Sequence, residues 1–283
     1  MRGDETPSNG SLEMGLTLRE RDADMTDSKM FDLSGKVAVV TGGSRGIGRS
    51  ICEQMAAHGA KVVVSSRKLP ACEEVVKAIA AKGGEATAVA ASISDKAQLE
   101  NLVATARRTY GRIDIMVCNA ASNPYFGPLS GLKEEVFLKI MQNNVMSNIA
   151  LMNMVGPEMA ERKDGVFIIV SSIGGLVGSA HIAAYNMSKA ADINLVKSLA
   201  MEWGKHNIRV NCIAPGLIQT NFAKALWDNP EIRKANESKA ALKRIGQPDD
   251  IGGVAVFLAS RAGNFVCGQT IIADGGVIGS GAE

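Results

Sequence analysis

Residues 36–48 read KVAVVTGGSRGIG, a run of β-branched residues that passes directly into a glycine-rich turn. The next residues, RSICEQMAAHGA, space Ile51, Met55 and Ala56 along one face of a helix. A strand, a glycine turn and a helix in this order let backbone N–H groups approach a pyrophosphate closely. The segment therefore predicts a nucleotide site. Its contacts are expected from Gly42, Ser44, Arg45, Gly46, Ile47 and Gly48.

Six further apolar runs follow along the chain. They read KVVVSSR, EATAVAAS, IDIMVCNA, GVFIIVSS, RVNCIAPG and QTIIADGG. Nearly all lack the polar alternation of a half-exposed strand, so both faces of each strand are expected to be covered. We therefore expect a single α/β domain of Rossmann type, with a doubly wound, seven-stranded parallel sheet between helix layers. Ligands bind such folds beyond the carboxyl ends of the strands.

Composition excludes several classes of partner. Lys and Arg number 31 against 29 Asp and Glu, so no basic field favours nucleic acid. The five cysteines are odd in number and spread through apolar runs, as in a cytoplasmic protein with reduced thiols. The three histidines lack ligand spacing, so no metal is expected. Residues 165–188 carry no charge, but their glycines and polar residues argue against a membrane span.

The N-terminal residues differ from the rest of the chain. Residues 1–32 are polar and mixed in charge, and they lack the apolar segment of a signal peptide. We interpret them as a flexible extension of a domain that comprises residues 33–283. Whether the extension is a functional arm or an artefact of the start site is open at this point.

Several motifs occur in register with the expected strands. They are the glycine turn, CNAA at 118–121, NNV with Asn144, Ser172, YNMSK at 185–189, and APGLIQT with Pro215 and Gly216. With these motifs, the chain from Leu33 to Val277 resembles the classical short-chain dehydrogenase/reductase family. NPYFGPL and RVNCIAPGLIQTNFAKALW resemble its NADP-dependent carbonyl reductases of the peroxisomal retinal-reductase type. The C-terminal GSGAE is not a peroxisomal address, so a cytoplasmic location is expected.

Tyr185 and Lys189 are four residues apart, so on a helix their side chains share one face. The resemblance implies that this face meets the nicotinamide ribose. A free tyrosine titrates near pH ~10, and an adjacent cation favours the phenolate, which makes proton exchange near neutrality feasible. Tyr185 would protonate a carbonyl oxygen that Ser172 also hydrogen-bonds. In the family, the asparagine at the position of Asn144 holds a water that links the lysine to solvent.

The residues after the second strand indicate NADP(H) as the cofactor. An NAD-type protein would place an acid there, and this chain has SSRK instead. Ser66 and Arg67, with Arg45 of the glycine turn, can pair a 2′-phosphate, although each arginine alone also suits a solvated surface. Ser92 stands where the family often has an adenine-contacting Asp, and its side chain or the Ile93 backbone can substitute. The resemblance implies further cofactor contacts from Asn119, Ala120, Ala121, Tyr185, Lys189, Pro215, Gly216, Ile218 and Thr220.

The predicted substrate is a small-molecule carbonyl or alcohol, because three mainly apolar segments flank the expected site. Their pocket candidates, which core packing explains equally well, are Tyr125, Phe126, Ile173, Leu176, Val177, Leu217, Phe222 and Trp227. The length of the last segment predicts a substrate flap at about 217–247. We expect an NADPH-dependent reductase of ketones, aldehydes or diketones, or the reverse reaction. The resemblance also implies a homotetramer through helices around 133–161 and 182–204.

Two other functions fit the sequence. The segment 217–247 has six basic residues against three acidic ones, an excess that could attract an acyl-carrier or CoA thioester. Reduction of a 3-oxoacyl thioester is therefore the enzymatic alternative. A non-catalytic NADP sensor or scaffold is the alternative of another class, since a fold alone does not give activity. The intact set of Asn144, Ser172, Tyr185 and Lys189 argues against it.

Overall fold

The computed structural model describes residues 29–279 of the chain. The expected N-terminal extension therefore lies outside the described residues, except for 29–32. One of them contacts the domain, since the Met30 carbonyl accepts a hydrogen bond of 3.0 Å from the Ala262 amide. Leu33 follows and is 1% exposed.

Seven parallel strands form one sheet, as the apolar runs predict. The strands are β1 Val37–Thr41, β2 Lys61–Ser66, β3 Glu85–Ala90, β4 Ile115–Cys118, β5 Gly165–Val170, β6 Ile208–Pro215 and β7 Thr270–Ala273. Their order is β3-β2-β1-β4-β5-β6-β7, and every neighbouring pair is parallel. The connections run outward in both directions from the β1–β4 boundary, which is the switch point where ligands bind in doubly wound sheets.

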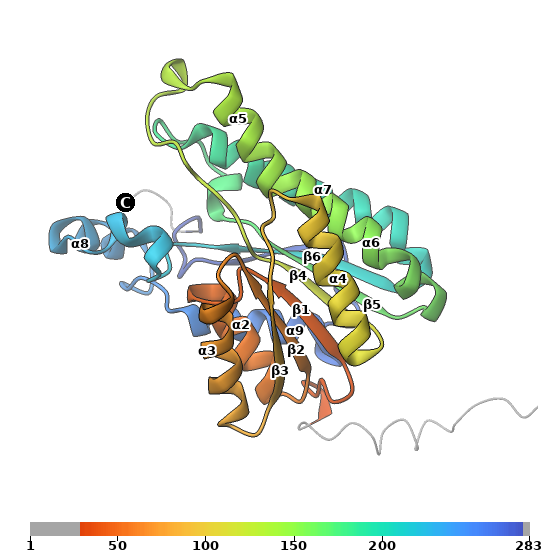
Figure 1. Ribbon diagram of the computed structural model, residues 1–283. Helices are drawn as coiled ribbons and strands as arrows, with labels where there is room; N and C mark the ends of the chain where they lie inside the picture. Colours follow the sequence, from red (N-terminus) through yellow and green to blue (C-terminus); the bar gives the residue numbers. More distant parts are fainter. Residues whose placement is uncertain (1–28, 280–283) are drawn as a thin grey trace, which may run out of the picture.

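Helices connect the strands and cover both faces of the sheet (Figure 1). They are α2 Gly46–Ala57, α3 Leu69–Ala80, α4 Lys96–Tyr110, α5 Glu134–Met141, α6 Ser147–Arg162, α7 Ala183–Trp203, α8 Pro230–Lys239 and α9 Pro248–Ala259. A π-helical turn, Gln142–Met146, joins α5 to α6. No helix among residues 29–279 has the length and apolarity needed to cross a membrane.

The core consists of two apolar clusters, one on each face of the sheet. In β1, Val40 packs with Ile51 of α2 and Ile251 of α9, while Val39 packs with Leu151 of α6 and Val196 of α7. Successive strand residues point to opposite faces, so a run of apolar residues supplies both clusters. The expectation of a sheet covered on both faces is therefore confirmed.

The segment expected to be a flap begins beyond the carboxyl end of β6. It forms a 3-10 helix, Asn221–Leu226, and then α8. Figure 1 shows α8 at one end of the molecule, away from both helix layers. Asn229 caps α8, because its side-chain oxygen accepts hydrogen bonds from the Glu231 and Ile232 amides. No residue of α8 is buried, which suits an element that covers a site rather than a core.

Candidate active site

The glycine turn between β1 and α2 has the backbone geometry of a phosphate cradle. Gly42 and Gly46 have φ values of +66° and +54°, where a side chain is strained. A Cβ added at Gly48 would lie 2.3 Å from the Gly42 carbonyl oxygen, so this position also requires glycine. The N-cap residue of α2, Arg45, makes no side-chain cap. The turn and the helix N-terminus therefore fit a pyrophosphate.

The loop after β4 fastens this turn. The Asn119 side-chain amide donates to the carbonyl oxygens of Thr41 and Gly42, at 2.9 and 3.2 Å. The Thr41 hydroxyl oxygen accepts hydrogen bonds from the Asn119 and Ala120 amides, each at 3.1 Å. The side-chain and backbone N–H groups of Asn119 thus hold the turn. The partly exposed Ala120 and Ala121 follow it at the carboxyl edge of the sheet.

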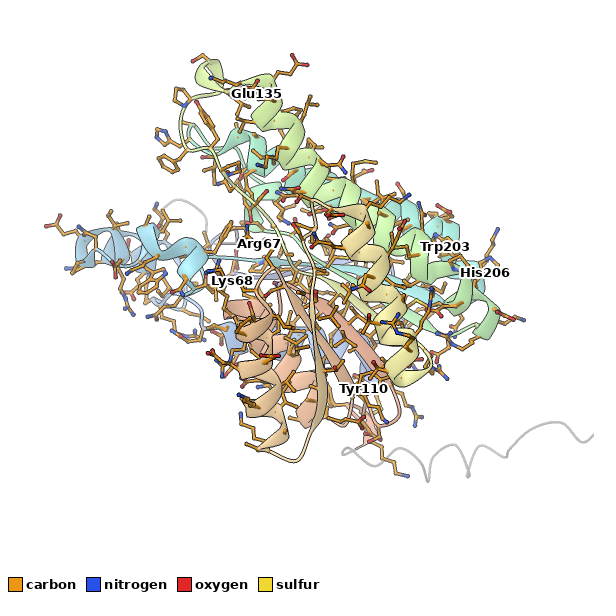
Figure 2. All side chains as sticks on the ribbon, in the orientation of Figure 1. Arg67, Lys68, Tyr110, Glu135, Trp203 and His206 are labelled. Atoms are coloured by element: carbon orange, nitrogen blue, oxygen red, sulfur yellow. The ribbon has the colours of Figure 1, made fainter. Side chains whose placement is uncertain are left out.

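The end of β2 carries exposed positive charge. Arg67 and, in the glycine turn, Arg45 are exposed, and neither forms an ion pair with another residue in the described part of the chain. Figure 2 shows Arg67 and Lys68 beyond the carboxyl end of β2. Lys68, which was not among the predicted contacts, adds a third cation here. Ser66 hydrogen-bonds the Cys72 thiol at 3.1 Å.

The loop after β3 is closed by its own polar contacts. The Ser92 amide donates to the side-chain oxygen of Gln98 at 2.9 Å, and the Ser92 hydroxyl lies 2.8 Å from that of Ser94. Asp95 caps α4 by accepting from the Gln98 amide. Ile93 packs against the cluster that faces α4, α6 and α7.

The segment after β6 contributes backbone more than side chains. Pro215 is buried, and Ile218 is 5% exposed in the cluster that faces α2 and α9. A ligand can therefore reach Ile218 only through its backbone. Thr220 lies against the cradle, since a Cβ added at Gly46 would meet its methyl carbon at 2.9 Å. Gly216 packs closely on Asp274 of the segment after β7.

Ser172 follows β5, and Tyr185 and Lys189 lie on α7, which packs against the turn that follows Ser172. The Ser172 hydroxyl oxygen accepts from the Gly174 amide at 3.0 Å, which leaves its hydrogen free to donate to a ligand. The Ser171 hydroxyl donates to the Lys189 carbonyl at 2.8 Å, and Lys189 Nζ donates to the Val170 carbonyl at 2.9 Å. These bonds fasten α7 to the end of β5. The Lys189 Nζ lies 5.8 Å from the centroid of the Tyr185 ring.

Asn144 lies in the π-helical turn and is fully buried. Its side-chain oxygen accepts from the Ser122 amide at 2.8 Å, and its amide donates to the Ser122 carbonyl and the Ser188 hydroxyl, each at 3.0 Å. The turn thus joins the loop after β4 to α7. The Asn144 carbonyl accepts a hydrogen bond of 2.7 Å from the side-chain amide of Asn148.

Asp192 was missed by the sequence reasoning, although it lies one helical turn beyond Lys189. Its Oδ2 is 3.0 Å from Lys189 Nζ, and its Oδ1 accepts from the Asn148 amide at 2.9 Å. Asp192 is 0% and Lys189 2% exposed. Burial raises the pKa of Asp192, an effect that Lys189 partly offsets. The i, i+3 spacing of Lys189 and Asp192 was the available signal.

Apolar side chains surround the Tyr185 side of the site. Leu176, Val177, Phe126 and Phe222 are all exposed, the last two by 72% and 57%. The Phe222 ring lies 6.2 Å from that of Tyr185, and Phe126 stacks on His181 at 5.3 Å. The loop after β4, the loop before Tyr185 and the flap segment were expected to line a substrate site, and each of them presents apolar surface. Trp227 instead donates its indole N–H to the Thr220 carbonyl, within the flap segment.

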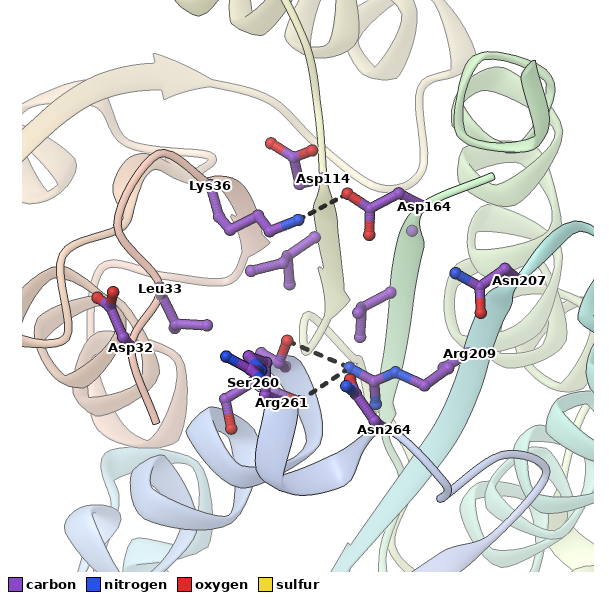
Figure 3. Close-up of a pocket in the computed structure, with 14 residues that line it drawn as sticks. Asp32, Leu33, Lys36, Asp114, Asp164, Asn207, Arg209, Ser260, Arg261 and Asn264 are labelled. Carbon is purple, nitrogen blue, oxygen red and sulfur yellow. Dashed lines mark hydrogen bonds and ion pairs between the residues drawn. The ribbon is translucent and has the colours of Figure 1, made fainter. Parts of the chain in front are cut away.

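A separate cavity of about 280 Å³ lies at the amino edge of the sheet (Figure 3). Its charged groups are engaged with one another or with backbone. Lys36 pairs with Asp164 at 2.6 Å. Arg209 donates to the carbonyl of Ala259, the last residue of α9, and to that of Gly263. These contacts close the base of the domain. No cluster of three or more potential metal ligands occurs within residues 29–279.

The known proteins to which this chain is similar are described as dehydrogenases or reductases. Residues 42–278 match a family profile described as enoyl-(acyl carrier protein) reductase. Dehydrogenase/reductase SDR family member 4 of Bos taurus is 40% identical over 244 residues, which cover 86% of this chain and 88% of that protein.

The solved structures that share the fold include two that carry a nicotinamide cofactor. One is a 7 alpha-hydroxysteroid dehydrogenase complexed with NADH and 7-oxo glycochenodeoxycholic acid, with a TM-score of 0.85 and 36% identity over 89% of this chain and 98% of that one. The other is a 3-oxoacyl (acyl-carrier-protein) reductase from Agrobacterium tumefaciens C58 with NADP bound. Its TM-score is 0.84, with 32% identity over 89% of this chain and 98% of that one.

Proposed function

The chain belongs to the short-chain dehydrogenase/reductase family, and we propose that it is an NADPH-dependent oxidoreductase that reduces a ketone, aldehyde or diketone to an alcohol, or catalyses the reverse reaction. The observation that carries the proposal is the junction of β5 and α7. There Ser172, Tyr185 and Lys189 lie at the edge of the sheet that also holds the glycine cradle.

A nicotinamide cofactor, when bound, would supply the hydride for the carbonyl carbon. Tyr185 gives its hydroxyl proton to the carbonyl oxygen, so the substrate gains one hydride and one proton. Ser172 donates its free hydroxyl hydrogen to the same oxygen and stabilises the charge that develops there. Lys189 places its cation beside the Tyr185 ring, and its remaining N–H would hold the cofactor ribose. Asn144 holds Ser122 and α7 in place.

The preference for NADP(H) rests on local residues. The two similar structures carry NADH in one case and NADP in the other, so membership of the family leaves the choice open. The support comes from Arg45 and Arg67, whose guanidinium groups are exposed and unpaired among the described residues, with no acid at the end of β2. A 2′-phosphate dianion is a suitable partner for both.

The thioester alternative is supported by the second similar structure, a 3-oxoacyl (acyl-carrier-protein) reductase, and the description of the family profile also names an acyl carrier. The charges of the flap segment support the thioester alternative less than the count of its basic and acidic residues suggests. Lys224 pairs with Asp228 at 3.6 Å, and Arg233 pairs with Glu237 at 2.8 Å. These two pairs leave the net excess of the segment at three positive charges, but Arg244 also pairs with Asp250 beyond the segment at 2.6 Å, which lowers the positive field open to an acyl carrier.

We further propose that residues 217–247 form a flap over the substrate and that the protein is a cytoplasmic homotetramer. The assembly is supported by exposed apolar side chains on the expected interface helices. Met146 and Met201 are 48% and 86% exposed, and Leu138 is 56% exposed. The cytoplasmic location is supported by the five free thiols, four of them buried.

Oxidation of NADPH and NADH, followed at their nicotinamide absorbance, tests the proposal. A simple ketone, an aldehyde, a diketone and a 3-oxoacyl thioester are each offered to the full chain. We expect turnover of at least one simple carbonyl with NADPH ahead of NADH. Turnover of the thioester alone would support the enzymatic alternative. Tight NADPH binding without turnover of any member would favour a sensor.

A further inference from the structure

Two of the three N–H groups of Lys189 are engaged inside the protein. One donates to the Val170 carbonyl at 2.9 Å and one to Asp192 Oδ2 at 3.0 Å. An ammonium has three donors, so one remains for the cofactor and Tyr185 side. The ammonium therefore has a fixed position that does not depend on the cofactor. Asp192 supplies the charged part of that anchor.

Asp192 is surrounded by donors. Its Oδ2 accepts from Lys189, and its Oδ1 accepts from the side-chain amide of Asn148. The same amide also donates to the Asn144 carbonyl at 2.7 Å. A continuous path of protein hydrogen bonds thus runs from Asn144 through Asn148 and Asp192 to Lys189. These hydrogen bonds favour the ionised form of the carboxyl group and partly offset burial, which raises its pKa.

In this buried setting, the charge of Lys189 and the charge of Asp192 depend on each other. Burial opposes the charge of Lys189, but Asp192 together with Tyr185 outweighs the effect of burial, so the pKa of Lys189 lies above its usual range. The other titratable groups that face the lysine are Tyr185 on the same helix, Cys118 at the end of β4 and Cys212 on β6. Burial raises the pKa of Cys212 to about 12, and that of Cys118 is also raised. Neither thiol carries charge near neutral pH, which leaves the carboxylate as the counter-ion.

We infer that Asp192, oriented by Asn148, is a positioning residue of this site. It anchors the Lys189 ammonium beside Tyr185, keeps it cationic while buried, and links it to Asn144 without an intervening water. The inference rests on the proposed role of Lys189 in holding the cofactor ribose. Its consequence is that Asp192 sets the pH range over which the lysine can hold the cofactor.

The direction of the effect follows from the charges. Lys189 binds the ribose as a cation, so its contribution to affinity is lost as the pH rises through its pKa. Replacement of Asp192 by Asn removes the counter-ion at nearly constant shape, and the lysine then loses its proton at lower pH. An opposite charge within 4–6 Å shifts a pKa by about 1–3 units, so the alkaline loss of affinity is expected to begin about 1–3 pH units earlier.

The test is the dissociation constant of NADPH, followed by its fluorescence from pH 7 to about 10.5. It is measured in a Tyr185→Phe background, so that the phenol does not titrate. Asp192→Asn is compared with Asp192→Glu, which keeps the charge. Asp114→Asn is the matched control, because Asp114 is 2% exposed and binds the Val37 amide and Arg112 at the opposite edge of the sheet.

The inference predicts an early alkaline loss of affinity in Asp192→Asn, a smaller shift in Asp192→Glu, and an unshifted profile in Asp114→Asn. A uniform weakening of affinity at all pH values in Asp192→Asn would show a merely structural role and overturn it. If the parent protein binds neither NADPH nor NADH at any pH, the proposed function fails instead.

A measurement on the wild-type chain covers the case in which Asp192→Asn does not fold. The lysine side chains are labelled with ¹³C at Cε and titrated by NMR, with Lys189 assigned from the spectrum of Lys189→Arg. We expect the Lys189 signal to titrate after those of the surface lysines. Titration of Lys189 together with the surface lysines, or before them, would overturn the inference.

Discussion

The side-chain amide of Asn144 donates a hydrogen bond of 3.0 Å to the hydroxyl of Ser188, and both side chains are completely buried. Ser188 donates in turn to the Tyr185 carbonyl at 2.7 Å. The π-helical turn is thus joined to the first turns of α7, where Tyr185 and Lys189 lie. Asn144 therefore acts on the site through the placement of this helix, and its side chain is fully used in doing so.

Replacement of Ser188 by Ala tests this connection. It leaves one amide hydrogen of buried Asn144 without its partner, and an unsatisfied buried donor costs about 1–3 kcal/mol. We expect the free energy of unfolding in urea to fall by that amount, with a lower kcat. Ser198→Ala on the same helix is the control, because that hydroxyl is exposed and bonded only at 3.4 Å to the Asn194 carbonyl. Equal stability of the two variants would contradict the connection.

Tyr185→Phe tests the proposed acid. The ring is kept and only the hydroxyl is lost, so NADPH binding should stay nearly intact. The rate of carbonyl reduction should fall by a factor on the order of 10² or more, as expected for loss of a general acid. Binding is measured by fluorescence and turnover by steady-state kinetics. Near-normal turnover would eliminate this role for Tyr185.

Lys189→Ala should affect both quantities, because the same ammonium is proposed to hold the ribose and to act on the phenol. We expect a higher KM for NADPH together with a lower kcat. The variant also leaves Asp192 buried without its counter-ion, so the free energy of unfolding should fall as well. An effect on kcat alone would argue against the dual role of the lysine.

The fold could be predicted because its signals are local. Each strand is a β-branched run such as VAVVT at 37–41, and the glycine turn directly follows the first of these runs. The doubly wound topology then follows from the right-handed connection of parallel strands. The motif residues after each strand come together because parallel strands end at the same edge.

The hydrogen bonds that join Lys189, Asp192 and Asn148 could not be predicted from adjacent residues. Asn148 on α6 and Asp192 on α7 are 44 residues apart, and their contact exists only once the two helices pack side by side. For Ile218 the sequence indicated a site residue, because it lies in a motif, but in the structure its side chain packs in the core. The flap charges, counted as an excess, form ion pairs at i, i+4 that depend on α8 and the preceding 3-10 helix being formed.

Truncation tests where the folded domain begins. A chain that starts at Lys29 keeps Met30, whose carbonyl binds the Ala262 amide, and should retain activity and Tm. A chain that starts at Leu33 loses that bond and should have a slightly lower Tm. The comparison is made by thermal unfolding and by gel filtration. Unfolding or a changed assembly state in the longer variant would mean that residues 1–28 are structurally required.

Cofactor discrimination is tested at Arg45 and Arg67, the exposed guanidinium groups beside the end of β2. If both bind the 2′-phosphate, replacing either by alanine should raise the KM for NADPH and change that for NADH little, because only NADPH carries the extra dianion. A hydrogen bond to a charged group of this kind corresponds to about tenfold or more per arginine before screening. Added salt should weaken NADPH binding more than NADH binding.

The measurement is kcat/KM for both cofactors at two ionic strengths. Arg108→Ala is the matched control, since Arg108 is an exposed arginine on α4 that binds only Thr105 among the side chains of the described chain. It should leave both cofactors unaffected, which separates local phosphate binding from a general loss of positive charge. A wild type that prefers NADH, or arginine variants that lose both cofactors equally, would assign these two arginines another role, and the choice of NADP(H) would then lack its support.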